Sequence, residues 1–160
     1  MPELHIRQAT PDDLTLILDF VKELADYENA LDEVKATTDD LHSALFGEQA
    51  KSYCVICESN GEPAGFALYF YNFSTWLGKF GLFLEDLYVT PSHRGTGAGK
   101  ALLKHLAQLA IDNDCGRFEW NVLDWNEPSI KFYESFGAQP QSEWIGYRLS
   151  GKALTDFAAS

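Results

Sequence analysis

The stretch RGTGAGKALL, Arg94 to Leu103, is the most informative part of the sequence, because it places three glycines within five positions directly before an apolar helical run. Glycine tolerates positive φ and carries no side chain, so such a loop either turns sharply or lets a ligand approach its N–H groups. Unpaired N–H groups and the positive end of a helix dipole together favour an anion. The sequence therefore predicts an anion-binding loop, with a glycine turn that only caps the helix as the alternative.

The sequence of this loop does not match either of two well-known phosphate-binding motifs. A Walker loop requires G-x-x-x-x-G-K-[ST], but Arg94 occupies the position of its first glycine and Ala101 that of its hydroxyl residue. A dinucleotide fingerprint, G-x-G-x-x-G, does not end on glycine whether it starts at Gly95 or at Gly97. The pattern that remains is R-x-x-G-x-G, which starts at Arg94 and ends at Gly99.

The rest of the chain alternates between strand and helix patterns. Apolar alternation and turn residues predict a hairpin centred on Asn60-Gly61. Helical spacing and caps predict the helices. We expect one α/β domain over residues 1–160, with a mixed, mostly antiparallel central sheet flanked by helices. The expected strands cover residues 5–9, 52–59, 64–73, 80–89, 117–123 and 143–149, and the expected helices cover residues 11–27, 38–46, 101–111 and 127–136, followed by a short terminal helix.

Composition excludes several classes of protein. A chain of 160 residues with 46% hydrophobic residues can build one sizeable core. The net charge of −12 argues against a nucleic-acid surface and favours attraction of small cations. No apolar run reaches the ~20 residues that span a bilayer, and the first residues do not resemble a signal peptide. We therefore expect a cytoplasmic protein with no membrane or nucleic-acid partner.

Cysteine and histidine spacing gives no indication of a metal site. Cys54 and Cys57 form a C-x-x-C, but they fall in an expected strand whose alternation sends residues three apart to opposite faces. Cys115 leaves an odd number of cysteines, which does not suggest a disulfide framework. The four histidines are scattered without ligand spacing. We expect no bound metal.

The R-x-x-G-x-G pattern and the strand before it resemble the coenzyme A loop of the GNAT superfamily of N-acetyltransferases. In that family the loop amides hold the pyrophosphate, and the pantetheine arm lies beside the preceding strand. The resemblance implies the GNAT fold and acetyl-CoA as co-substrate. The coenzyme-binding residues that it implies on the strand and loop are Leu87, Val89, Arg94, Gly95, Thr96, Gly97, Ala98, Gly99 and Lys100.

Longer stretches are similar to the spermidine/spermine N-acetyltransferase (diamine acetyltransferase) branch of that superfamily. STWLGKFGLFLEDLYV and VLDWNEPSIKFYESFGAQ carry this similarity, which extends over residues 6–149. Polyamine-acetylating members have an acid and a proline before the tryptophan that matches Trp76. This chain has Ser74-Thr75 there, as in members similar to those that act on thialysine and related amino acids. The implied acceptor is a small cationic amine: a diamine, a polyamine or a lysine-like amino acid.

The chemistry requires a proton acceptor for the amine and a proton donor for the thiolate. A primary amine with a pKa of ~10.4 is mostly protonated at pH 7, and a carboxylate in a cleft can accept its proton, directly or through water. We expect Glu85 to do so, and the alternative is that Glu85 pairs with a lysine or holds a strand bulge. The resemblance implies that Tyr133 is the general acid and that Asn126 and Ser129 bind the coenzyme beside it. The alternative is that Tyr133 is only an aromatic residue of the core.

The acceptor side is less well defined by the sequence. Carboxylates can bind an ammonium group and an indole offers a cation–π face. The residues that we expect to contact the acceptor are Glu28, Trp76, Glu85 and Asp86. The resemblance further implies a homodimer whose acceptor clefts use both chains. The competing functional hypothesis is a module that senses acyl-CoA without turnover.

Overall fold

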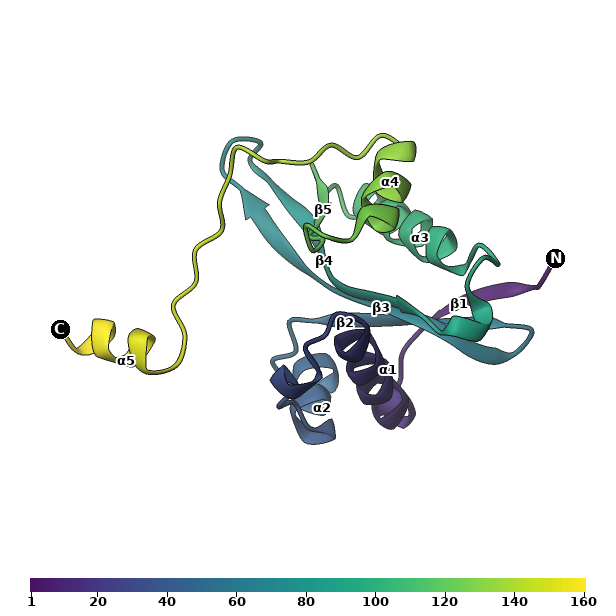
Figure 1. Ribbon diagram of the computed structural model, residues 1–160, viewed down its shortest axis with the longest axis horizontal. Helices are drawn as coiled ribbons and strands as arrows, with labels where there is room; N and C mark the ends of the chain where they lie inside the picture. The colour runs from purple at the N-terminus through teal and green to yellow at the C-terminus, as the bar shows by residue number, and fades with distance from the viewer. The chain divides into compact units, whose positions relative to one another are not determined.

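The computed structural model describes residues 1–160, which divide into two compact units, Met1–Asn121 and Val122–Ser160. The first unit is an α/β structure around one five-stranded sheet (Figure 1). Its strands are β1 (Leu4–Gln8), β2 (Tyr53–Ser59), β3 (Glu62–Ser74), β4 (Lys79–Val89) and β5 (Phe118–Trp120). Its helices are α1 (Leu14–Tyr27), α2 (Thr38–Phe46) and α3 (Ala98–Asp112), with short 3-10 turns at Pro11–Asp13, Leu31–Glu33 and Pro91–His93.

The sheet has the strand order β1-β2-β3-β4-β5. The first four strands are antiparallel neighbours, and β5 runs parallel to β4, with Leu82 opposite Phe118. The β2–β3 hairpin turns at Asn60 and Gly61, whose φ angles of 51° and 83° are those of a tight hairpin turn. The expected α/β fold with a mixed, mostly antiparallel sheet is confirmed.

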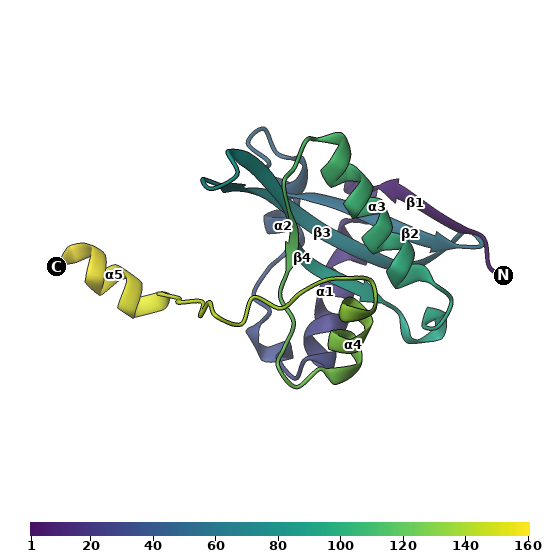
Figure 2. The same cartoon turned by 90° about the horizontal axis from the view of Figure 1, so that it is seen from above.

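Helices cover both faces of this sheet. On one face, α1 and α2 bury Ile17, Phe20 and Leu45 against the strand residues Ile56 and Phe66. On the other face, α3 packs across the strands (Figure 2). The buried residues of α3 recur at helical spacing and include Leu102, Leu103, Leu106 and Ala110. The expected helices of this unit are all present, although α3 begins three residues earlier than the sequence predicts.

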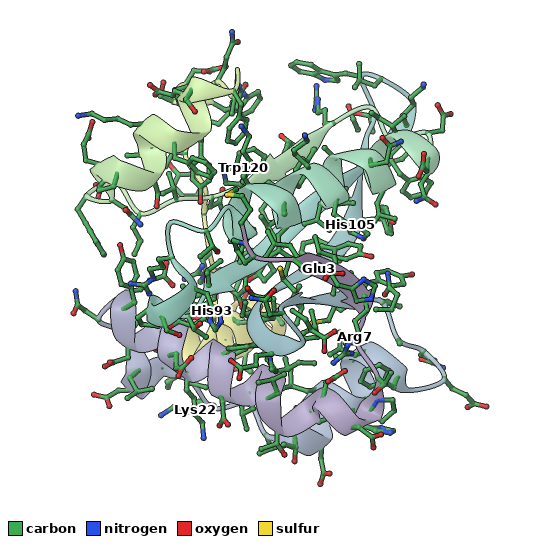
Figure 3. All side chains as sticks on the ribbon, turned by 90° about the vertical axis from the view of Figure 1, so that its right-hand side faces the viewer. Glu3, Arg7, Lys22, His93, His105 and Trp120 are labelled. Atoms are coloured by element: carbon green, nitrogen blue, oxygen red, sulfur yellow. The ribbon has the colours of Figure 1, made fainter.

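A network of three charged residues fixes the start of α1 against the sheet. The Arg7 guanidinium on β1 donates to both carboxylate oxygens of Asp13, at 2.8 and 2.9 Å, and its Nε lies 3.4 Å from Glu58. Arg7 is labelled in Figure 3. The Asp13 carboxylate also accepts from the N–H of Thr10. The hydrogen bond from Arg7 lowers the pKa of Asp13. We call Arg7, Asp13 and Glu58 the N-terminal ion-pair network.

The second unit contains two helices, α4 (Glu127–Ser135) and α5 (Gly151–Ala159). Gly137, with a φ of 98°, follows the end of α4 as the sequence predicts. The expected strand at residues 143–149 is wrong, because this segment forms neither strand nor helix. Aromatic and β-branched residues favour a strand only when a sheet edge pairs with them. The expected strand at 117–123 is likewise reduced to β5, Phe118–Trp120.

No helix in the structure is both long and apolar enough to cross a bilayer. No three His, Cys, Asp or Glu side chains are arranged to hold a metal ion. Cys54 and Cys57 are buried free thiols, and burial raises the pKa of Cys54 to about 12, so its thiolate is strongly disfavoured.

Candidate active site

An irregularity in β4 determines where its two acids point. Leu68 of β3 is opposite Asp86, but the next residue, Tyr69, is opposite Leu84. Glu85 is therefore the additional residue of a β-bulge, and its side chain is exposed. Glu85 and Asp86 are adjacent acids in an otherwise apolar strand, and the bulge explains how the strand places one of them in solvent. It does not exclude a chemical role for Glu85, since bulges often re-aim a side chain beside a site.

The carboxyl group of Asp86 has a strongly raised pKa. Burial, the neighbouring charge of Glu85 and the charge of Glu28 together raise the pKa of Asp86 to about 6. A carboxyl with this pKa changes its charge close to neutral pH, unlike an ordinary surface aspartate. The sequence predicts Asp86 as an acceptor contact from its carboxylate, but it could not show this change in pKa.

The charge of Glu28, at the end of α1, acts on Asp86, which lies on β4. It follows the last residue of α1, where its N–H donates to the carbonyl of Leu24. Burial raises the pKa of Glu28 as well. We call Glu28, Glu85 and Asp86 the acidic cluster, and the structure thus brings together three of the four expected acceptor contacts.

The ion pairs of the structure all involve other residues than the acidic cluster. Arg7, Lys79 and Lys152 provide their cations, and none of these contacts Glu28, Glu85 or Asp86. The alternative in which Glu85 pairs with a lysine therefore has no support in the structure. A bound cation would relieve the mutual repulsion of these carboxylates, so the site favours a positively charged ligand.

Trp76, the fourth expected acceptor contact, lies elsewhere. It belongs to the turn between β3 and β4, and 79% of its surface is exposed. Glu85 lies six positions after Lys79, the first residue of β4, which corresponds to roughly 20 Å at the rise of a strand. The structure thus does not bring Trp76 together with the acidic cluster, and its contact with the acceptor remains a prediction.

The glycine loop, residues 94–100, has the backbone conformation that its sequence predicts. Gly95 and Gly97 have φ angles of 77° and 90°, which residues with a side chain rarely adopt. A Cβ placed on either would meet nothing within 4 Å, so open space lies over this part of the loop. Gly97 directly precedes α3, whose first N–H groups are therefore available in this region. Lys100 is exposed on the first turn of the helix.

Two residues that the sequence analysis did not single out, Thr90 and His93, help to hold the segment before these glycines. The Thr90 hydroxyl lies 2.7 Å from Nδ1 of His93, and the Thr96 hydroxyl donates to the His93 carbonyl at 2.5 Å. Nε of Arg94 donates to the Val89 carbonyl at 3.2 Å. His93 is labelled in Figure 3. The signal that could have found these residues is a run of hydroxyl side chains around a histidine between the strand and the glycines.

The remaining expected site residues belong to the second unit. The Asn126 side chain is buried and accepts from the Ser129 N–H at 3.4 Å, which caps α4. Tyr133, one helical turn after Ser129, packs its ring against those of Phe132 and Phe136. The spacing predicted this shared helix face correctly. The roles of Asn126, Ser129 and Tyr133 at a coenzyme remain predictions.

The chain matches a protein-family model and is similar to several known proteins. A family model described as "Acetyltransferase (GNAT) family" matches residues 17–138. Thialysine N-epsilon-acetyltransferase from Sus scrofa is 36% identical over 99% of each chain. The human spermidine/spermine N(1)-acetyltransferase-like protein 1 is 38% identical over 99% of this chain and 24% of its own.

A solved structure agrees with these relatives. An integron cassette protein from the mobile metagenome of V. cholerae has a TM-score of 0.80 and 31% sequence identity, over 98% of each chain. The resemblance proposed from the glycine loop and the LED and WNEPSIKFY stretches is confirmed. By its sheet, its loop and these similarities over almost its whole length, the chain belongs to the acetyltransferase (GNAT) family.

Proposed function

We propose that this N-acetyltransferase moves the acetyl group of acetyl-CoA to the primary amine of a small cationic acceptor, in the cytoplasm. The observation that carries the proposal is the acidic cluster, in which Asp86 has a pKa raised to about 6 and no cation pairs with the three carboxylates. A site of this kind gains most from a ligand that brings its own positive charge. The printed names of the relatives, thialysine and spermidine/spermine acetyltransferases, support the same class of acceptor.

The glycine loop fits the diphosphate of coenzyme A. Gly95 and Gly97 leave open space above a backbone that leads into the 15-residue helix α3. Backbone N–H groups at a helix start bind phosphate oxygens favourably. We expect residues 94–100 to hold the diphosphate, and Leu87 and Val89 of β4 to lie along the pantetheine arm.

The chain's carboxylates prepare the acceptor for attack. In the proposed reaction, Glu85 takes a proton from the ammonium group, directly or through a water molecule. The neutral amine nitrogen then forms a bond to the thioester carbonyl carbon. Asp86 and Glu28 hold the acceptor's positive charge, and Asp86 must be ionised to do so. The exposed position of Glu85 on the bulge supports its contact with the acceptor.

Tyr133 is proposed to complete the transfer. When the carbon–sulfur bond breaks, its hydroxyl donates a proton to the departing thiolate, whose conjugate acid has a pKa of ~8.5, and the second proton that the attacking nitrogen loses as the amide forms returns to the tyrosine oxygen, directly or through water. We expect Tyr133→Phe to keep the ring contacts and CoA affinity while it lowers kcat roughly 10²-fold. Turnover by Tyr133→Phe equal to wild type, when chemistry limits the rate, would remove Tyr133 from the mechanism.

The acceptor can be narrowed within the class of cationic amines. Ser74-Thr75 stands before Trp76 where polyamine-acetylating members have an acid and a proline. We therefore expect lysine-like amino acids and short diamines to be better substrates than long polyamines, and amines without a second charge to be poor. A screen of amines with acetyl-CoA, followed by thiol release, tests this order. A clear preference for spermine would contradict it.

The same screen separates the enzyme from the acyl-CoA sensor. Calorimetry on the wild type measures acetyl-CoA binding independently of turnover. Gly97→Val places bulk in the open space of the loop, and we expect it to weaken CoA binding at least about tenfold. Binding without acetylation of any amine in a broad panel would favour the sensor. Unchanged affinity in folded Gly97→Val would overturn the assignment of the loop.

We further propose that the enzyme is a homodimer with shared acceptor clefts. Residues 143–149 form no strand in this chain, and Ile145 and Tyr147 are 78% and 96% exposed. Such aromatic and branched side chains suit the buried core of an interface. A partner chain would also explain the distance of Trp76 from Glu85. Light scattering should give twice the chain mass of 17.9 kDa, and a monomer at assay concentration would contradict the proposal.

A further inference from the structure

The side chain of Arg94 connects three elements of the first unit. Its guanidinium carbon lies 5.4 Å from the centre of the Tyr27 ring, at the end of α1, and 5.7 Å from the centre of the Tyr88 ring, on β4. Both distances are within the range of a cation–π contact. Arg94 itself begins the glycine loop. The last residue of α1 is thus joined to the first residue of the proposed diphosphate site.

The two rings differ in how firmly they are held. Tyr88 is 6% exposed, and its ring packs 6.0 Å from that of Phe20 in the core between α1 and the sheet. Burial and the charge of Glu23 raise the pKa of Tyr88, while the charge of Arg94 lowers it. Tyr27 is 46% exposed at the end of its helix. Tyr88 therefore provides a fixed surface, and Tyr27 covers the guanidinium from the side of α1.

We propose that Tyr27 is a positioning residue of this enzyme, which acts through Arg94 to hold the glycine loop ready for the coenzyme and to link that loop to the acidic cluster. The proposal rests on the proposed function of loop and cluster. An arginine side chain has many rotamers in solution, so a second ring that restricts it lowers the entropy lost when a diphosphate is bound. Nε of Arg94 already donates to the Val89 carbonyl, which restrains the inner part of the side chain.

The link to the acceptor follows from the chain itself. Glu28 is the residue after Tyr27, and its charge contributes to the raised pKa of Asp86. A ring that fixes the end of α1 against the loop therefore fixes Glu28 within the acidic cluster. We expect the loss of the Tyr27 ring to weaken coenzyme and acceptor binding together, whereas the chemical step, which uses other residues, changes little.

Three variants test this role. Tyr27→Leu removes the ring, Tyr27→Phe keeps it without the hydroxyl, and Tyr53→Leu is the matched control. Tyr53 is 42% exposed and contacts the rings of Tyr69 and Tyr71, but it lies over no cation. Calorimetry measures the Kd for CoA, steady-state kinetics give KM for the acceptor and kcat, and thermal unfolding verifies that each variant is folded.

We expect Tyr27→Leu to raise the Kd for CoA and the KM for the acceptor by roughly three- to tenfold, with kcat within about twofold of wild type. Tyr27→Phe should restore both, because the cation–π contact needs only the ring. Tyr53→Leu should leave both unchanged. A folded Tyr27→Leu with wild-type Kd and KM, or a Tyr27→Phe as impaired as Tyr27→Leu, would overturn the positioning role alone. A wild type that binds no CoA would overturn the proposed function as well.

Discussion

Two groups of carboxylates in the first unit have similar residues and opposite environments. In the N-terminal ion-pair network, Asp13 is buried against Arg7, which donates to both of its oxygens, and its pKa is lowered. In the acidic cluster, Asp86 is partly buried beside Glu28 and Glu85, and its pKa is raised to about 6. Burial disfavours the charged form in both places, so the partner decides the direction of the shift.

This contrast distinguishes a carboxylate that stabilises the fold from one that is prepared for a ligand. The charge of Asp13 is compensated within the chain, and it holds the start of α1 to β1. The charge of Asp86 is not compensated by any cation of the chain, which costs stability until a cation binds. Active sites commonly retain such unfavourable arrangements because they are useful for binding and catalysis.

The largest effect that would sharpen this contrast is expected on catalysis. Glu85→Gln should lower kcat/KM roughly 10²-fold at neutral pH and make its rise toward alkaline pH steeper, because the neutral amine must then come from solution alone and its fraction grows about tenfold per pH unit. Asp13→Glu is the matched control, since it retains a carboxylate that can pair with Arg7. Comparable losses in the two variants would show that the assay reports on folding rather than on the acidic cluster.

The next effect concerns stability. Asp13→Asn should lower the free energy of unfolding by about 2 kcal/mol, because it leaves the Arg7 guanidinium with weakened hydrogen bonds. The pKa of Asp13 is lowered from 3.8, so this stabilisation is present above about pH 3.8 and is lost as the pH falls through the folded-state value. Urea titrations of wild type and variant at several pH values measure the difference. A difference that grows toward acid pH would contradict the assigned role of the pair.

Asp86→Asn should change stability in the opposite direction. The pKa of Asp86 rises from 3.8 in the unfolded chain to about 6 in the fold, so its ionisation destabilises the folded state increasingly from pH 3.8 to 6. Above pH 6 we expect the variant to be more stable than wild type by about 1 kcal/mol, and to have a higher KM for the cationic acceptor. Equal stability at pH 5 and pH 8 relative to wild type would show that the charge of Asp86 is compensated.

The smallest effect is expected from the most distant member of the cluster. Glu28→Gln removes the third cause of the raised pKa of Asp86, after burial and Glu85. We expect kcat/KM of the wild type to show an inflection near pH 6, where Asp86 ionises, and in Glu28→Gln this inflection should move to slightly lower pH. Asp26→Asn, an exposed neighbour on α1, is the control and should leave the inflection in place.

Local features of the fold could be predicted from the sequence where they depend on neighbouring residues. The hairpin at Asn60-Gly61, the helix that ends at Gly47 and the positive φ angles of Gly95 and Gly97 all follow from short-range backbone preferences. The strand expected at 143–149 failed for the converse reason. Its residues favour an extended backbone, but a strand exists only where a second strand pairs with it.

Some features of the candidate site could likewise be predicted from the sequence, whereas others depend on the tertiary structure. The R-x-x-G-x-G loop and two longer stretches identified the family from the sequence, and the chemistry of the side chains indicated Glu85 and Asp86 as candidates for the acceptor site. Which acid is exposed could not be predicted, since the bulge arises from the register between β3 and β4. The position of Trp76 relative to Glu85 also depends on the length of that hairpin.

The sequence by itself determined the class of fold, the glycine loop and the residue types available for acyl transfer, because these depend on local backbone preference and on side-chain chemistry. Only the tertiary structure decided that Glu28 raises the pKa of Asp86 and that Tyr27 covers Arg94. Both pairs join α1 to residues far along the chain, and electrostatic and cation–π energies depend on distance in space. No local pattern specifies that distance; the packing of α1 against the sheet does.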